Sequence, residues 1–172
     1  MSEKEETVFG KNIMVKENVY LAPDKVNRNL MSNIFNYYVN MYKGKCTQAN
    51  GYMIDVIKIN KIISNFISRV DFNIVFEVEF EIIAHIPKVG DIHTCEVFLV
   101  FKEGIFAKLQ TLKIFVHSNK FPNYLFDYTN STYVNTENGD VLKTGSIITV
   151  EILGTKYKDK NFSCFGSIVT IN

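Results

Sequence analysis

The sequence predicts an α+β protein in two parts: a small antiparallel sheet packed with one main helix, followed by a five-stranded β-barrel. Three observations support this prediction. One amphipathic helical stretch lies within the first 45 residues, apolar and charged residues alternate strictly from Phe76 to Ile82, and five short apolar runs follow Pro87. We therefore expect an N-terminal domain over residues 1–86 and a C-terminal domain over residues 87–172.

The N-terminal part opens with a strand-like run from Asn12 to Leu21. Pro23-Asp24 predicts the start of a helix, because proline and an acidic residue are favoured in the first turn. Gly44 predicts its end, since glycine favours a left-handed C-cap. Between these signals, apolar residues recur every three or four positions at Val26, Leu30, Ile34, Tyr37/Tyr38 and Met41.

The sheet of this domain is predicted from apolar runs at Tyr52–Ile59 and Asn65–Ile67, with a polar turn around Asn60-Lys61, and from the alternation at Phe76–Ile82. One face of the last strand is apolar, and the other carries Glu77, Glu79 and Glu81. We interpret this glutamate row as a solvated face or a surface for a basic partner, because no base, nucleophile or further ligand lies nearby in the sequence.

The second part contains five predicted strands with a polar, aromatic segment between the third and fourth. The strands are Gly90–Phe101, Ile105–Leu109, Lys113–His117, Ser146–Leu153 and Ser163–Ile171, the long segment is Asn119–Thr144, and a loop over Gly154–Asn161 joins the last two strands. Five strands in this order predict an OB-fold barrel.

Composition narrows the function classes. Of 172 residues, 47% are hydrophobic, which supports a buried core, and 19 basic against 18 acidic residues leave a net charge of +1. So small an excess disfavours strong generic nucleic-acid binding. We expect the charged start, residues 2–7, to be disordered. Its acidic character and the lack of a long apolar run predict a soluble intracellular protein with no membrane contact.

Residues for catalysis are few. His85, His93 and His117 lie far apart, the cysteines Cys46, Cys95 and Cys164 form no C-x-x-C pair, and the nine glycines form no phosphate-binding loop. We therefore predict a non-enzyme with no catalytic residues, no metal and no cofactor, and free buried thiols. His93 and Cys95 two residues apart leave a cofactor site open as an alternative.

Residues for RNA contact are more numerous. Aromatic side chains on an OB-fold stack on bases and lysines contact phosphates. The second and third barrel strands and the last predicted loop supply the candidates, which are Phe106, Lys108, Lys113, Phe115, His117, Lys156, Tyr157, Lys158 and Lys160. Two alternatives stay open: both phenylalanines can equally face the barrel core, and the loop can be an ordinary solvated hairpin.

The order of several short motifs resembles a known family along nearly the whole chain. These motifs are Gly44-Lys45-Cys46, Asn50-Gly51-Tyr52, the segment Ala84–Asp91 with Pro87 and Gly90, Gly104-Ile105-Phe106, Ile114-Phe115-Val116 and Gly166-Ser167-Ile168. Together they resemble the stalk subunit of multisubunit DNA-dependent RNA polymerases, called subunit seven in eukaryotic RNA polymerase II, and its archaeal counterpart. The third barrel strand also resembles RNA-binding barrels of the ribosomal S-one type.

The resemblance implies a non-catalytic subunit that docks on the polymerase core and contacts nascent RNA during initiation and elongation. Its implied partners are the largest subunit, a small core subunit and a helical stalk partner. The implied core-docking loops would present Asn50, Gly51, Tyr52, Asn60, Lys61 and Asn65. A free-standing OB-fold RNA-binding protein or translation factor is the alternative.

Basic residues are strongly biased toward lysine, because Arg28 and Arg69 are the only arginines among 19 basic side chains. This bias indicates an AT-rich coding sequence, as of a virus or a protist. Together with the poor match of Asn123–Gly139 to the family, it predicts a divergent viral member. Such a protein would lie in the virion and host cytoplasm, whereas a cellular subunit would lie in the nucleus.

Overall fold

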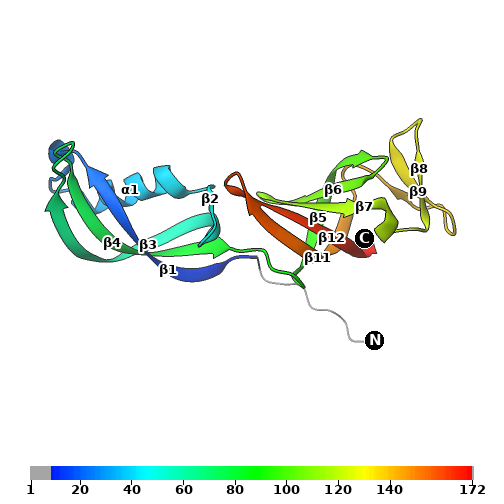
Figure 1. Cartoon of the computed structure of the whole chain (residues 1–172), viewed down its shortest axis with the longest axis horizontal. Helices are drawn as coiled ribbons and strands as arrows, with labels where there is room; N and C mark the ends of the chain where they lie inside the picture. The colour runs from blue at the N-terminus through cyan, green and yellow to red at the C-terminus, as the bar shows by residue number, and fades with distance from the viewer. Residues whose placement is uncertain (1–8, 172) are drawn as a thin grey trace. The chain divides into compact units, whose positions relative to one another are not determined.

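A computed structural model of the chain describes residues 9–171, so the charged start at 2–7 lies outside the described residues. The chain forms two compact units, residues 10–86 and the residues from Pro87 onward, with Phe9 grouped with the second. We call them the sheet unit and the barrel unit, and Figure 1 shows the elements of each.

The sheet unit is a four-stranded antiparallel sheet in the order β1-β4-β3-β2, with one α-helix packed on it. Its elements are β1 (Lys11–Leu21), α1 (Leu30–Tyr42), β2 (Cys46–Thr47), β3 (Gly51–Ile67) and β4 (Ile74–His85). Ile34 and Tyr38 of the helix are fully buried, and the Tyr38 ring stacks on Phe80 of β4 at 3.8 Å between centroids. The predicted helix-on-sheet arrangement is confirmed.

The helix begins later than the sequence predicted. Pro23–Lys25 form a separate 3-10 turn, η1, and the α-helix starts at Leu30. The side-chain oxygen of Asn27 accepts a hydrogen bond from the Asn29 amide at 2.8 Å. Asparagine side chains that bond to nearby backbone compete with helical hydrogen bonds, which explains the delayed start.

The polar turn predicted at Asn60-Lys61 is wrong, because β3 runs unbroken from Gly51 to Ile67. Its register against β4 shifts four times, skipping Ile54, Ile57, Asn60 and Ile63. Each bulge adds one unpaired residue, so the sequence loses its period of two while the strand continues. The break in the alternation caused by these bulges was therefore interpreted as a turn, although the strand continues.

The alternation on β4 is confirmed, with Phe76, Val78, Phe80 and Ile82 all buried beneath the helix. The three glutamates on the other face contact side chains of the neighbouring strand β3. Glu79 pairs with Lys61 at 4.0 Å, Glu81 pairs with Lys58 at 3.3 Å, and Glu77 accepts a hydrogen bond from Ser64 at 2.9 Å. The row is thus part of a polar ladder across the sheet face.

The barrel unit contains a closed five-stranded barrel in the order β11-β12-β7-β6-β5, which confirms the predicted OB-type architecture. The strands are β5 (Ile92–Phe101), β6 (Gly104–Leu109), β7 (Leu112–His117), β11 (Ile147–Lys158) and β12 (Asn161–Ile171). Strands β7 and β12 pair in parallel, and the other neighbours pair antiparallel.

The segment predicted as an irregular excursion forms a second, three-stranded sheet in the order β10-β9-β8. It follows the 3-10 turn η2 (Ser118–Lys120) and consists of β8 (Tyr124–Asp127), β9 (Thr132–Asn135) and β10 (Val141–Leu142). Tyr133 of β9 is buried, and its hydroxyl donates to the carbonyls of Phe101 and Lys102 at 3.0 and 2.7 Å. This residue attaches the small sheet to the β5–β6 turn.

The last hairpin is also longer than predicted. Residues assigned to a loop from Gly154 onward continue β11, and the turn itself consists of Asp159 and Lys160, both with positive φ angles of 51° and 60°. Such a turn matches the twist of two paired strands and keeps them together to their ends. Within residues 9–171, no helix combines the length and apolar character needed to span a membrane.

Candidate functional site

The outer face of β6 and β7 carries five of the predicted RNA contacts. Ile105, Ala107, Ile114 and Val116 are fully buried inside the barrel. Because side chains alternate along a strand, their neighbours in the sequence must point outward. These outward residues are Phe106, Lys108, Lys113, Phe115 and His117. The alternative that the two phenylalanines form the barrel core is therefore excluded.

Aromatic rings gather on this face. Phe106 lies 5.1 Å from Phe115 between centroids, and both lie 5.8 Å from Phe101. Phe98 adds a fourth ring 6.0 Å from Phe106, and His117 contacts Phe115 edge-on at 6.1 Å. Phe98 and Phe101 were not among the predicted contacts, although they belong to the strand predicted at Gly90–Phe101.

The two lysines of this face have different neighbours. The ammonium group of Lys113 lies 5.7 Å from the centroid of the Phe98 ring. Lys108 forms an exposed ion pair with Glu96 of β5 at 3.4 Å. An exposed pair of this kind contributes little to stability, so Lys108 can exchange its partner for another anion at small cost.

The lysines near the chain end lie mostly on a strand and not on a loop. Lys156 and Lys158 are exposed on β11 and pair in register with Ser163 and Asn161. Tyr157 points to the opposite side, where its ring meets Phe162 edge-on at 5.1 Å. Tyr157 is therefore separated from the two lysines that flank it in the sequence. Lys160 lies in the turn.

The residues predicted for core docking are spread along β3 and the turn before it. Gly51 begins β3, whereas Asn60, Lys61 and Asn65 follow along the same strand, and Asn65 pairs with Phe76. Tyr52 is 3% exposed, so its side chain belongs to the interior of the unit. The amide of Asn50 donates to the Thr47 hydroxyl at 3.1 Å within the β2–β3 turn.

The β3–β4 turn carries a different surface that was not predicted from the sequence. Figure 1 shows this turn at one end of the sheet unit, with β2 at the other. Phe66, Ile67, Val70 and Phe72 are 54%, 66%, 93% and 72% exposed, and we call these four residues the apolar tip. Large apolar side chains gathered at an exposed turn are typical of an interaction surface.

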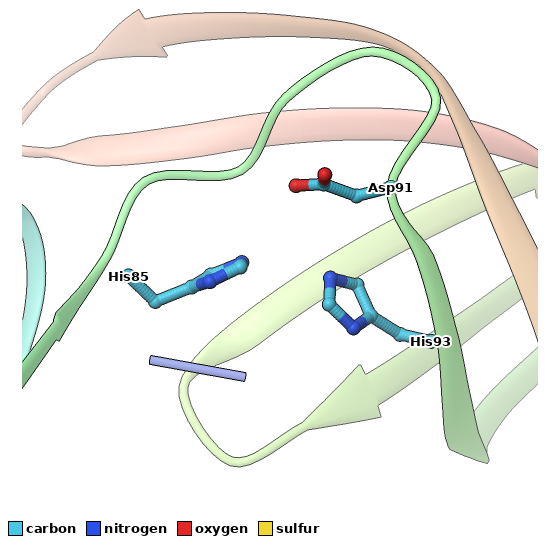
Figure 2. A group of neighbouring side chains, drawn as sticks. All are labelled: His85, Asp91 and His93. Atoms are coloured by element: carbon cyan, nitrogen blue, oxygen red, sulfur yellow. The ribbon is translucent and has the colours of Figure 1, made fainter. Parts of the chain in front are cut away.

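His93 and Cys95 both point into the barrel, with 0% and 2% exposure. Figure 2 shows His93 on β5 and Asp91 just before it, and an imidazole nitrogen and a carboxylate oxygen of the two lie within 4.8 Å. Asp91 also accepts a hydrogen bond from the Lys88 amide at 2.8 Å, which closes the turn before β5. His85, drawn in the same figure, ends β4 in the sheet unit. Cys46, Cys95 and Cys164 are buried, and within residues 9–171 none of them forms a disulfide.

Comparison with curated proteins finds similarity along both units. The chain is 26% identical to RNA polymerase II subunit RPB7 of Glycine max over 159 residues, which cover 91% of this chain and 90% of that protein. It is 25% identical to subunit 7 of Arabidopsis thaliana with the same coverage, and 21% identical to rpb7 of Dictyostelium discoideum over 160 residues. The chain is a divergent relative of RPB7.

Two further comparisons add little to this relationship. No protein-family model matches the chain. The apo form of RNase R from Mycoplasma genitalium aligns with 45% of this chain and 13% of its own length, at 12% identity and a TM-score of 0.39. At this score the alignment supports no conclusion about fold or function, so the RPB7 relationship depends on sequence similarity across the two units.

Proposed function

We propose that this chain is a non-catalytic subunit of a DNA-directed RNA polymerase. The observation that carries the proposal is the similarity to RPB7 proteins, which extends over 91% of the chain and so includes both the sheet unit and the barrel unit. A relative that shared only an RNA-binding barrel would match the second unit alone. A helical subunit of the same polymerase is the proposed stalk partner.

The sheet unit would dock on the polymerase core through the apolar tip. The four exposed apolar side chains of the tip support this assignment, because burying them in a partner removes a large apolar area from water. The apolar tip adds to the docking residues expected at Asn60, Lys61 and Asn65, which are exposed on β3.

The barrel unit would contact nascent RNA with the outer face of β6 and β7. Phe106 and Phe115 supply rings that bases can stack on, and Lys113 and Lys108 supply positive charge beside them. Lys156 and Lys158 add charge from β11. The small net charge of +1 makes this contact a local one.

Affinity purification from the native source tests the assembly. A tagged chain should recover the largest polymerase subunit, a small core subunit and a helical partner, identified by mass spectrometry. Recovery of no polymerase subunit would contradict the proposal. Recovery of ribosomal proteins in their place would support the alternative of a free-standing RNA-binding protein or translation factor.

Substitution of Phe72 by glycine separates docking from folding. Phe72 has a φ of 57°, a left-handed conformation that is strained for a bulky residue and unstrained for glycine. Phe72→Gly should therefore keep the free energy of unfolding or raise it by about 1 kcal/mol. The same variant should recover less polymerase, because it removes a side chain that is 72% exposed at the apolar tip.

Tyr128→Ala is the matched control, since Tyr128 is 71% exposed on the barrel unit and lies outside the apolar tip. It should recover polymerase at the wild-type yield. Wild-type recovery by both Phe72→Gly and Val70→Ser would exclude the tip as the docking surface.

The cellular location of the protein follows from its source. Lysine-rich usage supports an AT-rich genome, as of a virus or a protist; for a viral protein we propose the virion and host cytoplasm, whereas a cellular subunit would lie in the nucleus. Immunofluorescence with a transcription-site marker distinguishes the two locations.

A further inference from the structure

Three phenylalanines form one row across the outside of the barrel. Phe106 of β6 pairs in register with Phe115 of β7, and Phe115 lies level with Phe165 of β12. On the far side of β12, Phe165 pairs with Gly154 of β11. Phe106, Phe115 and Phe165 therefore occupy the same level on three consecutive strands, about 5 Å apart from strand to strand. We call them the aromatic row.

A second row lies two residues away along β6, β7 and β11, with Ser163 of β12 between the last two. Lys108 pairs with Lys113, and Lys156 pairs with Ser163. Ser163 is level with Lys113, because the next residues, Cys164 and Ile114, are register partners in the parallel pair. Lys108, Lys113 and Lys156 are all exposed and form a lysine row, about 7 Å from the aromatic row.

The Phe165 ring packs against the backbone of Gly154 on the neighbouring strand β11. A β-carbon added to Gly154 would lie 2.1 Å from the Phe165 ring, so the ring lies directly on the glycine backbone. The absence of a side chain at Gly154 makes this close approach possible. Phe165 remains 54% exposed, which leaves its outer surface open to a partner.

We propose that a single RNA strand crosses β6, β7 and β12 with its bases on the aromatic row and its phosphates on the lysine row. The proposal builds on the RNA contact proposed for β6 and β7. It adds Phe165 as a third stacking platform and Lys156 as the phosphate contact beside it. Aromatic rings that bind bases and lysines that follow the backbone are the two elements of sequence-tolerant single-strand binding.

The arrangement of charge favours a polynucleotide over an apolar protein segment. All three lysines lie on one side of the aromatic row. A ligand that contacts both rows must therefore carry negative charge along one edge and flat rings along the other. Glu96 of β5 pairs with Lys108 at the end of the lysine row. A carboxylate at this position repels phosphate, and the RNA path would therefore end at β6.

Two ligands and two variants of the full-length chain test the arrangement. The ligands are a fluorescent oligouridylate and an abasic ribose-phosphate chain of the same length. Phe165→Ala should lower the affinity for oligouridylate by roughly five- to 150-fold and leave the affinity for the abasic chain unchanged, because only bases can stack. Lys156→Ala should weaken both ligands and reduce the slope of log affinity against log salt by about 0.7.

Matched controls keep the test independent of folding. Leu125 is 64% exposed on the small sheet and Lys143 is exposed before β11, so Leu125→Ala and Lys143→Ala should bind oligouridylate like wild type. Phe165→Tyr retains the ring and should restore affinity for oligouridylate.

Three outcomes would overturn the proposal in distinguishable ways. If Phe106→Ala weakens binding and Phe165→Ala does not, the path across β12 is wrong while the contact at β6 and β7 stands. If Phe165→Ala weakens the abasic chain as strongly as oligouridylate, Phe165 does not stack on bases. If wild type binds neither ligand, both this path and the proposed RNA contact are wrong.

Discussion

Glu17 points from β1 toward the helix, on the same face as the buried Val15 and Val19. Burial raises the pKa of this carboxyl above its ordinary value. Burial also raises the pKa of Tyr38 and Tyr42, and the negative charge of Glu17 raises both further. Glu17 is thus a partly buried carboxylate beside two tyrosines, where the loss of water disfavours its ionised form.

Glu17→Gln should raise the free energy of unfolding at neutral pH. The folded protein holds the Glu17 proton more tightly than the unfolded chain, so the native state loses stability as the pH rises from 4.5 through the raised pKa. The advantage of the variant should be full above that pKa and should disappear as the pH falls below 4.5. Urea denaturation across this range measures the difference, and an advantage independent of pH would contradict the explanation.

The directions of individual barrel side chains were only partly predictable. Alternation placed Phe106 and Lys108 on one face, yet it left open whether that face was the core or the surface. Ile105 and Ala107, both fully buried, decide this point. Phe165 had no distinguishing pattern in the predicted strand Ser163–Ile171, because its position depends on the register of β12 against both β7 and β11.

The small sheet of β8, β9 and β10 depends on Tyr133 for its attachment to the barrel. The Tyr133 ring packs edge-on against Phe121 at 4.8 Å and against Phe126 at 5.2 Å. Its hydroxyl donates to two carbonyls of the β5–β6 turn. Short strands cannot be stable alone, so this aromatic cluster and these hydrogen bonds hold the sheet in place.

Tyr133→Phe and Tyr38→Phe should have opposite effects on stability. Removing the Tyr133 hydroxyl leaves two carbonyls of the turn without this donor and should cost about 1–2 kcal/mol. The Tyr38 hydroxyl is buried and has no hydrogen-bond partner among residues 9–171, so its removal should be neutral or stabilising by up to about 1 kcal/mol. Chemical denaturation of both variants checks the contrast, and a larger loss for Tyr38→Phe would contradict it.

Strand β3 shows why element boundaries were harder to predict than element types. Ile54, Ile57, Asn60 and Ile63 are skipped in the register against β4, one in every three residues. A search for a period of two therefore finds short apolar runs with breaks. The partner strand β4 has no such irregularity on its own side, and its alternation was correctly predicted.

The molecule as a whole carries almost no net charge, because its 19 basic residues are nearly balanced by 18 acidic ones. Electrostatic attraction to RNA must therefore come from local clusters such as the lysine row. Glu96, paired with Lys108, weakens one member of that row.

This balance predicts a shallow salt dependence for RNA binding by the full-length chain. Two to three phosphate contacts should give a slope of log affinity against log salt of roughly −1.5 to −2 for a single strand. Fluorescence anisotropy at several salt concentrations measures the slope. A slope several times steeper would indicate many more phosphate contacts than the lysine row supplies.

Several features of this protein were determined by the sequence alone. They are the α+β class, the helix after the first strand, the buried face of β4, the five barrel strands and the resemblance to subunit seven of RNA polymerase II. The elements depend on local periodicity and the resemblance on similarity along the chain, and both can be recognised in the sequence without a structure.

The tertiary structure decided which side chains meet. Pairing of β12 with β7 and β11 brings Phe165 level with Phe115 and places it over Gly154. Because β3 continues to Ile67, the exposed apolar side chains within residues 66–72 lie at its end and in the turn that follows. Register and bulges depend on contacts between strands distant in sequence, so no local pattern contains them. The predicted RNA contacts at Phe106 and Phe115 thus became part of a longer row only once the barrel was closed.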